Sequence, residues 1–92
     1  MEIKQRDDTK KGAFYVEENG ETLAEMTYVW AGPEKFIIDH TEVSPVLGGK
    51  GVGKQMVMKA VEFAREGGLK ILPLCPFAKS VFDRDKSIAD VL

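Results

Sequence analysis

The feature that most constrains this chain is a glycine-rich loop between an apolar extended segment and an amphipathic helix. Glycine occupies positions 48, 49, 51 and 53, after the strand-like run 35–43 and at the start of the helical pattern 51–66. Glycines allow successive backbone N–H groups to converge on one point, and the following helix adds its unpaired N-terminal donors and the positive end of its dipole. This layout predicts an anion-binding site that a diphosphate would satisfy.

Two nucleotide-binding patterns match this loop only in part. The dinucleotide fingerprint G-x-G-x-x-G, started at Gly49, needs a third small residue where Lys54 stands, and 92 residues are too few for a full dinucleotide fold. The pattern G-x-x-x-x-G-K-[S/T] matches Gly48, Gly53 and Lys54, but Gln55 replaces the hydroxyl that would hold magnesium. A nucleotide-binding P-loop protein therefore stands as the third alternative for this chain.

A third pattern, [Q/R]-x-x-G-x-[G/A], fits from position 48, with Gly51 and Gly53 in its glycine slots and Gly48 where Gln or Arg is usual. It is the coenzyme A pyrophosphate loop of the GNAT acetyltransferases. Further matching stretches follow one another in order at residues 40–43, 49–53, 69–73 and 75–77. Together these stretches resemble the family of very small, single-domain GNAT-like N-acetyltransferases, and the resemblance covers most of the chain from Ala24 onward.

The N-terminal half reads as a meander of antiparallel strands. Strand-like composition predicts extended segments at 3–5, 13–18, 22–30 and 35–43. Asn19-Gly20 is a two-residue hairpin signal, because both positions tolerate positive φ. We expect each strand to add beside the previous one.

The C-terminal half predicts helices around one short strand. Apolar residues recur at helical spacing from Gly51 to Glu66, and Gly67-Gly68 predicts the cap that ends the helix. A strand at 69–72, reached by a crossover, would lie parallel to strand 35–43, and the prolines at 73 and 76 would keep the gap between the two strands open. A helix at 76–82 and an amphipathic tail, with Ile88, Val91 and Leu92 packing back, complete an α+β fold (mixed α/β) of the minimal GNAT-like type.

His40 is the only histidine, and it lies in strand 35–43. Strict alternation places Phe36, Ile38, His40 and Glu42 on one face, and Ile37, Asp39, Thr41 and Val43 on the other. One reading is therefore a half-buried histidine packed among apolar residues. The other is a catalytic base or orienting group, because histidine exchanges a proton near neutral pH. Glu42 is expected to be solvated.

Cys75 is the only cysteine, and it precedes Pro76, a favoured first residue of a helix. We expect the thiol at the N-cap of that helix, where the dipole favours a reactive thiolate. The other reading is a small buried hydrophobic residue between Leu74 and Phe77. The family resemblance favours Cys75 as the first candidate for catalysis.

The resemblance implies an N-acetyltransferase that uses acetyl-coenzyme A as cosubstrate and acts on an unidentified amine of a small molecule, peptide or protein. Its implied catalytic residues are Cys75 and His40. Its implied coenzyme-binding residues are Thr41, Glu42, Val43, Gly48, Gly49, Lys50, Gly51, Val52, Gly53, Lys54 and Cys75. The alternative from another class is a non-catalytic acyl-coenzyme A binding or sensor module that keeps the loop and uses Cys75 and His40 only for packing.

Composition excludes several other classes. With 43% apolar and 30% charged residues, the chain is expected to form one domain, 1–92, and its net charge of −2 without a basic stripe argues against nucleic-acid binding. One cysteine and one histidine argue against a metal centre. No signal-like or membrane-spanning run is visible, so we expect a cytoplasmic protein. The family's usual last two strands have no counterpart here, so we expect a monomer with an open groove or a weak homodimer that completes it.

Overall fold

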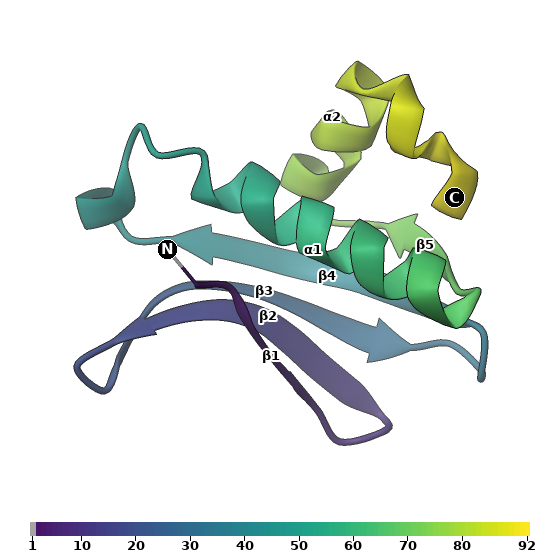
Figure 1. The fold of residues 1–92 in the computed structure, drawn as a ribbon, viewed down its shortest axis with the longest axis horizontal. Helices are drawn as coiled ribbons and strands as arrows, with labels where there is room; N and C mark the ends of the chain where they lie inside the picture. The colour runs from purple at the N-terminus through teal and green to yellow at the C-terminus, as the bar shows by residue number, and fades with distance from the viewer. Residues whose placement is uncertain (1) are drawn as a thin grey trace.

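A computed structural model describes residues 2–92 and shows one five-stranded sheet (Figure 1). The strands lie in the order β1-β2-β3-β4-β5, so each adds beside the previous one. Neighbours are antiparallel except β4 and β5, which are parallel. The predicted meander with a parallel fifth strand is confirmed. The strand bounds are Lys4–Asp7 for β1, Lys11–Glu18 for β2, Glu21–Trp30 for β3, Lys35–Val43 for β4 and Lys70–Pro73 for β5.

Two helices accompany the sheet (Figure 1). Helix α1, Val52–Gly67, crosses one face of the sheet and ends at Gly68, which adopts the predicted left-handed cap. Helix α2, Pro76–Arg84, is two residues longer than predicted and is followed by a 3₁₀ helix, Lys86–Val91. The tail packs back through Ile88 and Val91, as predicted. The expectation for Leu92 is wrong, because its side chain is half exposed at the end of the chain.

The core lies between α1 and the covered face of the sheet. The largest fully buried side chains include Tyr28 of β3, Phe36 and Ile38 of β4, and Met56 of α1. Their burial removes large apolar surfaces from water, which is the main force that holds the sheet and helix together. Phe63 of α1 is half-buried and packs against this aromatic cluster, 5.7 Å from the Phe36 ring centroid.

The hydroxyl of Tyr28 extends from this core cluster to the edge of the sheet, at the end of β1. Its hydroxyl donates to Asp7 Oδ2 at 2.6 Å and accepts from Gln5 Nε2 at 2.9 Å. Burial, followed by the hydrogen bond to Asp7, raises the pKa of Tyr28. Burial alone would raise the pKa of Asp7, but hydrogen bonds donated by Tyr28, the Thr9 amide and Trp30 outweigh it and lower that pKa. The pair fixes the end of β1 against β3.

A β-bulge divides β4. Tyr28 pairs with Ile38, but the next residue of β3, Thr27, pairs with His40, so Asp39 is an extra residue in the strand. An extra residue reverses the side-chain alternation beyond it. Thr41 therefore faces the side of the sheet that α1 covers, while His40 turns to the opposite, outer face.

The predicted faces of strand 35–43 are accordingly wrong from His40 onward. The side chains of His40 and Glu42 are 65% and 78% exposed on the outer face, which neither α1 nor α2 covers. The half-buried reading of His40 is therefore wrong, whereas Glu42 is solvated as expected. Strict alternation failed because a bulge inserts one residue without leaving a sequence pattern.

Strand β5 accompanies β4 only as far as Ile38. The last paired residues are Ile38 and Pro73, and the amides of Leu74 and Cys75 both donate to the Ile38 carbonyl at 3.0 Å. The chain then turns away into α2, whose first residue, Pro76, has no N–H to donate. The segment 39–43 thus continues without β5 beside it, so the predicted gap between the two strands is confirmed.

Candidate active site

The glycine loop connects the open end of β4 to α1. A 3₁₀ turn, Pro45–Leu47, follows β4, and the chain then passes through Gly49 and Gly51 at φ 77° and 67°. Both values lie in the left-handed region that glycine adopts at no steric cost. Gly51 is the N-cap of α1 and makes no side-chain cap. The loop is therefore shaped by its glycines, as the sequence predicts.

The first turn of α1 presents unsatisfied donors. The first helical bond runs from the Gln55 amide to the Gly51 carbonyl at 3.0 Å, and no residue within 2–92 accepts from the amides of Val52, Gly53 or Lys54. The first turn of α1 contains no acidic residue. Unpaired amides at the positive end of a helix dipole form a site for an anion such as a diphosphate.

Gln55 has a supporting role in the loop. Its side-chain Nε2 donates to the carbonyl of Lys50 at 3.0 Å, which ties the loop to the second turn of α1. In the nucleotide-binding pattern this position holds a hydroxyl that contacts magnesium. The amide side chain of Gln55 instead braces the loop, which disfavours the third alternative.

Gly53 is needed for packing as well as for the loop. A Cβ at this position would lie 2.5 Å from the Phe77 ring of α2, closer than carbon atoms approach. The start of α2 therefore rests directly on the first turn of α1. This contact brings the N-terminus of α2, with Cys75, close to the glycine loop.

The half of β4 beyond the bulge has one unoccupied edge. The Ser44 amide donates to the Leu23 carbonyl of β3 at 2.7 Å, so the backbone groups of Ser44 point toward β3. Backbone groups alternate between the two edges of a strand, so the amides and carbonyls of Val43 and Thr41 point away from β3. They face the gap that β5 leaves, where an extended ligand with amide groups could pair with them.

The structure brings Cys75 and Thr41 together across this gap. Cys75 is the N-cap of α2, as predicted, and is 5% exposed. Its Sγ lies 3.2 Å from Thr41 Oγ1, within hydrogen-bond distance for sulfur. The residue thus combines the two readings of the sequence: it is packed in the core, and its thiol has a polar partner at the edge of the gap.

His40 does not join them, because it lies on the outer face. Its Nε2 is 3.7 Å from a Glu42 carboxylate oxygen, and both side chains are exposed. The predicted catalytic pair therefore divides between the two faces of β4, with Cys75 on the α1 side and His40 on the outer side.

Apolar side chains are exposed on both sides of Cys75 in the chain and just after β4, and the sequence did not identify them. Leu74 is 60% exposed and Phe77 40% exposed beside Cys75, while Val46 is exposed where β4 meets the loop. In the sequence each resembles an ordinary core residue, and only the departure of β5 from β4 reveals their position.

Within 2–92, no three His, Cys, Asp or Glu side chains gather in a way that could hold a metal ion. None of the helices described there combines the length and the apolar character needed to cross a membrane.

The family model for GCN5-related N-acetyl-transferases matches residues 13–91, which include β3, β4, the glycine loop, α1, β5 and α2. This chain belongs to that family. The predicted family and the predicted minimal GNAT-like α+β fold are confirmed. No curated protein sequence matches the chain.

Several solved structures resemble this GNAT chain. The solution structure of a GCN5-like protein from Staphylococcus aureus is 40% identical, with 97% of this chain and 86% of that one covered at a TM-score of 0.71. Ribosomal-protein-alanine N-acetyltransferase from Brucella melitensis biovar Abortus 2308 is 17% identical, with 84% and 62% covered at a TM-score of 0.68. Aminoglycoside N-acetyltransferase AAC(6')-Iy, in complex with coenzyme A, is 12% identical, with 90% and 88% covered at a TM-score of 0.61. The last two show a shared fold alone.

Proposed function

We propose that this GNAT protein transfers the acetyl group of acetyl-coenzyme A to an amine of a small molecule, peptide or protein. The proposal rests on one observation: three features lie next to one another. They are the unpaired amides at the start of α1, the unoccupied edge of β4, and Cys75 beside that edge. Together they offer a diphosphate site, a backbone edge and a thiol in the order in which the parts of acetyl-coenzyme A follow one another.

The coenzyme would lie along this path. Its pyrophosphate would accept hydrogen bonds from the amides of Gly51–Lys54, and its pantetheine amides would pair with Thr41 and Val43. Leu74 and Phe77 would cover the alkyl parts of the arm. The remaining predicted contacts, from Glu42, Gly48, Gly49 and Lys50, stay predictions. The Glu42 side chain lies on the outer face and its backbone groups point toward β3, so neither is directed at the gap.

Acetyl transfer requires that the amine lose a proton and that the carbonyl be polarised. In direct transfer, the deprotonated amine nitrogen attacks the carbonyl carbon, the C–S bond breaks, and the coenzyme leaves as a thiolate that takes up a proton. In the covalent route, the deprotonated Cys75 sulfur attacks the carbonyl carbon, and the coenzyme leaves as a thiolate that takes up a proton. The deprotonated amine then attacks the acetyl-cysteine thioester, whose C–S bond breaks, and the Cys75 thiolate takes up a proton. His40 can accept the amine proton in either route if the acceptor approaches from the outer face.

A non-catalytic acyl-coenzyme A sensor is the second candidate. The 5% exposure of Cys75 favours it, because a packed thiol is poorly placed to attack. Both the enzyme and the sensor would bind the coenzyme, but only the enzyme would turn it over. We further propose that residues 1–92 act as one cytoplasmic domain, as a monomer or a weak homodimer.

The test is calorimetric titration with acetyl-coenzyme A, with ATP plus magnesium as the control ligand. Saturable binding of the coenzyme alone supports the proposal, and absence of coenzyme binding contradicts it. Coenzyme release measured across a panel of amines then separates enzyme from sensor. Full activity in Cys75→Ala would exclude a catalytic role for the thiol, and absence of acetylated Cys75 in peptide mass spectra would contradict the covalent route.

A further inference from the structure

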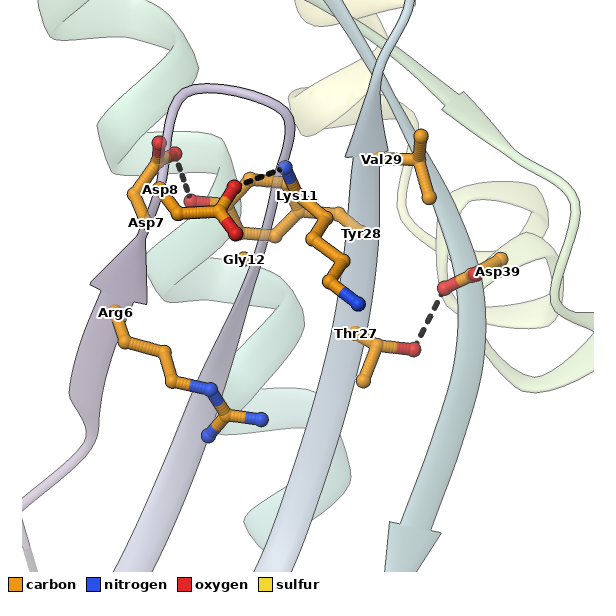
Figure 2. A pocket seen from close by; sticks show the side chains of 9 residues that line it. All are labelled: Arg6, Asp7, Asp8, Lys11, Gly12, Thr27, Tyr28, Val29 and Asp39. Carbon is orange, nitrogen blue, oxygen red and sulfur yellow. Dashed lines mark hydrogen bonds between the residues drawn. The ribbon is translucent and has the colours of Figure 1, made fainter.

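A hollow of about 400 Å³ lies on the outer face of the sheet, on the side of β4 opposite to Cys75 (Figure 2). It spans β1 to β4, and its charged lining side chains are Arg6, Asp7, Asp8, Lys11 and Asp39. The volume falls in the range of sites that bind small molecules. The glycine loop and the gap beside β4 do not contribute to it, so it is separate from the path proposed for the coenzyme.

Three of these charged groups are occupied by contacts within the protein. Arg6 forms an ion pair with Glu25, and its guanidinium lies 5.2 Å from the centroid of the Tyr15 ring. Asp7 accepts hydrogen bonds from Tyr28 and Trp30. A ligand could bind Arg6 or Asp7 only by breaking these contacts within the protein.

Asp8 is similarly committed to the turn between β1 and β2. Its Oδ1 accepts from the backbone amides of Lys10 and Lys11, both at 2.9 Å. These two bonds, and the nearby Lys10 and Lys11 charges, lower the pKa of Asp8. This carboxylate therefore serves to order the turn.

Lys11 and Asp39 remain as the charges of the hollow that neither order a turn nor enter an ion pair within residues 2–92. Within residues 2–92, the Lys11 ammonium forms neither an ion pair nor a hydrogen bond. Asp39 forms no ion pair there either; its Oδ1 accepts from Thr27 Oγ1 at 2.6 Å, and Oδ2 has no donor. Figure 2 shows the Lys11 side chain reaching across the sheet toward Thr27 and Asp39. Apart from the turn that Asp8 orders, the hollow thus offers one positive and one negative group to a ligand.

The position of Asp39 links the hollow to the chemistry. Asp39 is the extra residue of the bulge, so it lies in the part of β4 whose other edge would hold the coenzyme. The neighbouring His40 also faces outward and could accept a proton there. An acetyl group held in the gap and an amine held in the hollow would approach each other from the two sides of β4.

We propose that this hollow is the acceptor site, and that the acceptor is an amine that also carries a carboxylate, of the size of an amino acid or a dipeptide. The amine nitrogen lies at Asp39 and the carboxylate at Lys11. The acceptor role rests on the proposed acetyltransferase function; the binding of such a ligand does not.

The binding test uses ¹⁵N-labelled protein without coenzyme, titrated with glycine, 4-aminobutyrate, 6-aminohexanoate and glycylglycine. Butylamine and butyrate, which each lack one of the charged groups, are the matched half-ligands. We expect one doubly charged ligand to shift the amides of Lys11, Thr27 and Asp39 at a concentration at least about tenfold lower than either half-ligand, since two anchored charges contribute where a half-ligand uses one.

Variants then assign the two charges. Lys11→Gln removes the tenfold advantage of the doubly charged ligand over butylamine, while Lys11→Arg retains it. Lys10→Gln is the matched control, because Lys10 has the same charge and lies outside the lining of the hollow, and it leaves the advantage unchanged. Asp39→Asn weakens every ligand that carries an amine. Equal binding of butylamine, or shifts confined to other residues, overturns the inference.

Failure of this inference and failure of the proposed function can be distinguished. Binding of acetyl-coenzyme A without any response at the hollow overturns the inference alone. Response at the hollow without coenzyme binding overturns the acetyltransferase function and the acceptor role together. If both ligands bind, coenzyme release should be faster with the best doubly charged ligand than with butylamine, and equal rates overturn the acceptor role.

Discussion

The two halves of β4 differ in their surroundings although they belong to one strand. Residues 35–38 pair with β3 on one edge and β5 on the other, and Phe36 and Ile38 are fully buried. Residues 39–43 pair with β3 alone, and none of them is fully buried. The first half therefore holds the sheet together, and the second half keeps backbone groups and side chains available for ligands.

The difference arises from two local features. The bulge at Asp39 reverses which side chains face α1, and Pro73 and Pro76 end the pairing of β5 with β4. A bulge beside a strand edge is a common way to direct a side chain toward a functional site. We infer that mutations in the first half should affect folding and that mutations in the second half should affect binding.

Phe36→Ala should have the largest effect on stability. Phe36 is fully buried against Tyr28 and Phe63, so the truncation leaves a cavity and should lower the free energy of unfolding by about 3–5 kcal/mol. Urea unfolding followed by circular dichroism measures it. Val43→Ala, in the second half, is the comparison and should lower it by less than about 1 kcal/mol. Equal losses at the two positions would contradict the division of β4.

Gly51→Ala should weaken both folding and coenzyme binding. The left-handed φ of 67° strains any residue with a Cβ, by about 1–2 kcal/mol. Relief of that strain would move the N-cap of α1, and we expect affinity for acetyl-coenzyme A to fall about tenfold, or about 1.4 kcal/mol. Gly20→Ala, at φ 79° in the β2–β3 turn, is the matched control. If the control lowers affinity equally, the loop has no specific role.

Thr41→Val tests the contact between the second half of β4 and α2. Loss of the hydroxyl removes the partner of Cys75 at a cost of about 1 kcal/mol or less. Because the hydroxyl can donate to a thiolate, alkylation of Cys75 by iodoacetamide should slow a few-fold, and Thr41→Ser should restore it. An unchanged alkylation rate in Thr41→Val would show that the contact does not affect the thiol.

Asp7→Asn should have the smallest effect, a loss of stability near neutral pH that disappears in acid. Although burial opposes it, hydrogen bonding lowers the pKa of Asp7 in the folded protein below its ordinary 3.8. Stability from this group is therefore fully present above that value and is lost as the pH falls below it through the folded pKa. Since Asp7 is exposed, we expect a difference below about 1 kcal/mol.

The measurement for Asp7 is urea unfolding of both proteins between pH 2 and pH 7. The wild type should lose more stability than Asp7→Asn between pH 4 and pH 2, and coenzyme affinity at pH 7 should be equal in the two. A parallel pH dependence would contradict the role assigned to the Asp7–Tyr28 pair.

Much of this fold was predictable because its signals are local. The Asn19-Gly20 turn adopts positive φ at both positions, and the apolar spacing of 51–66 produced α1 within one residue of its observed ends. The glycine loop was also predictable, since its conformation depends on residues adjacent in the sequence. These features needed no knowledge of distant contacts.

The arrangement of the site was less predictable because it depends on one inserted residue and on distant contacts. The bulge at Asp39 has no sequence signature, so the faces of Thr41 and His40 were interchanged. The contact between Cys75 and Thr41 joins residues 34 positions apart. The role of Lys11 depends on the contacts that occupy its charged neighbours, which periodicity does not reveal.

The division of β4 can be tested most directly by amide hydrogen exchange with and without acetyl-coenzyme A. We predict that the coenzyme slows exchange at Thr41, Val43 and the amides of 51–54, which face the gap or the loop, and leaves Phe36 and Ile38 as protected as before. Slowed exchange spread evenly over the sheet, or no change at Thr41 and Val43, would contradict the claim that the second half of β4 is the coenzyme-binding edge.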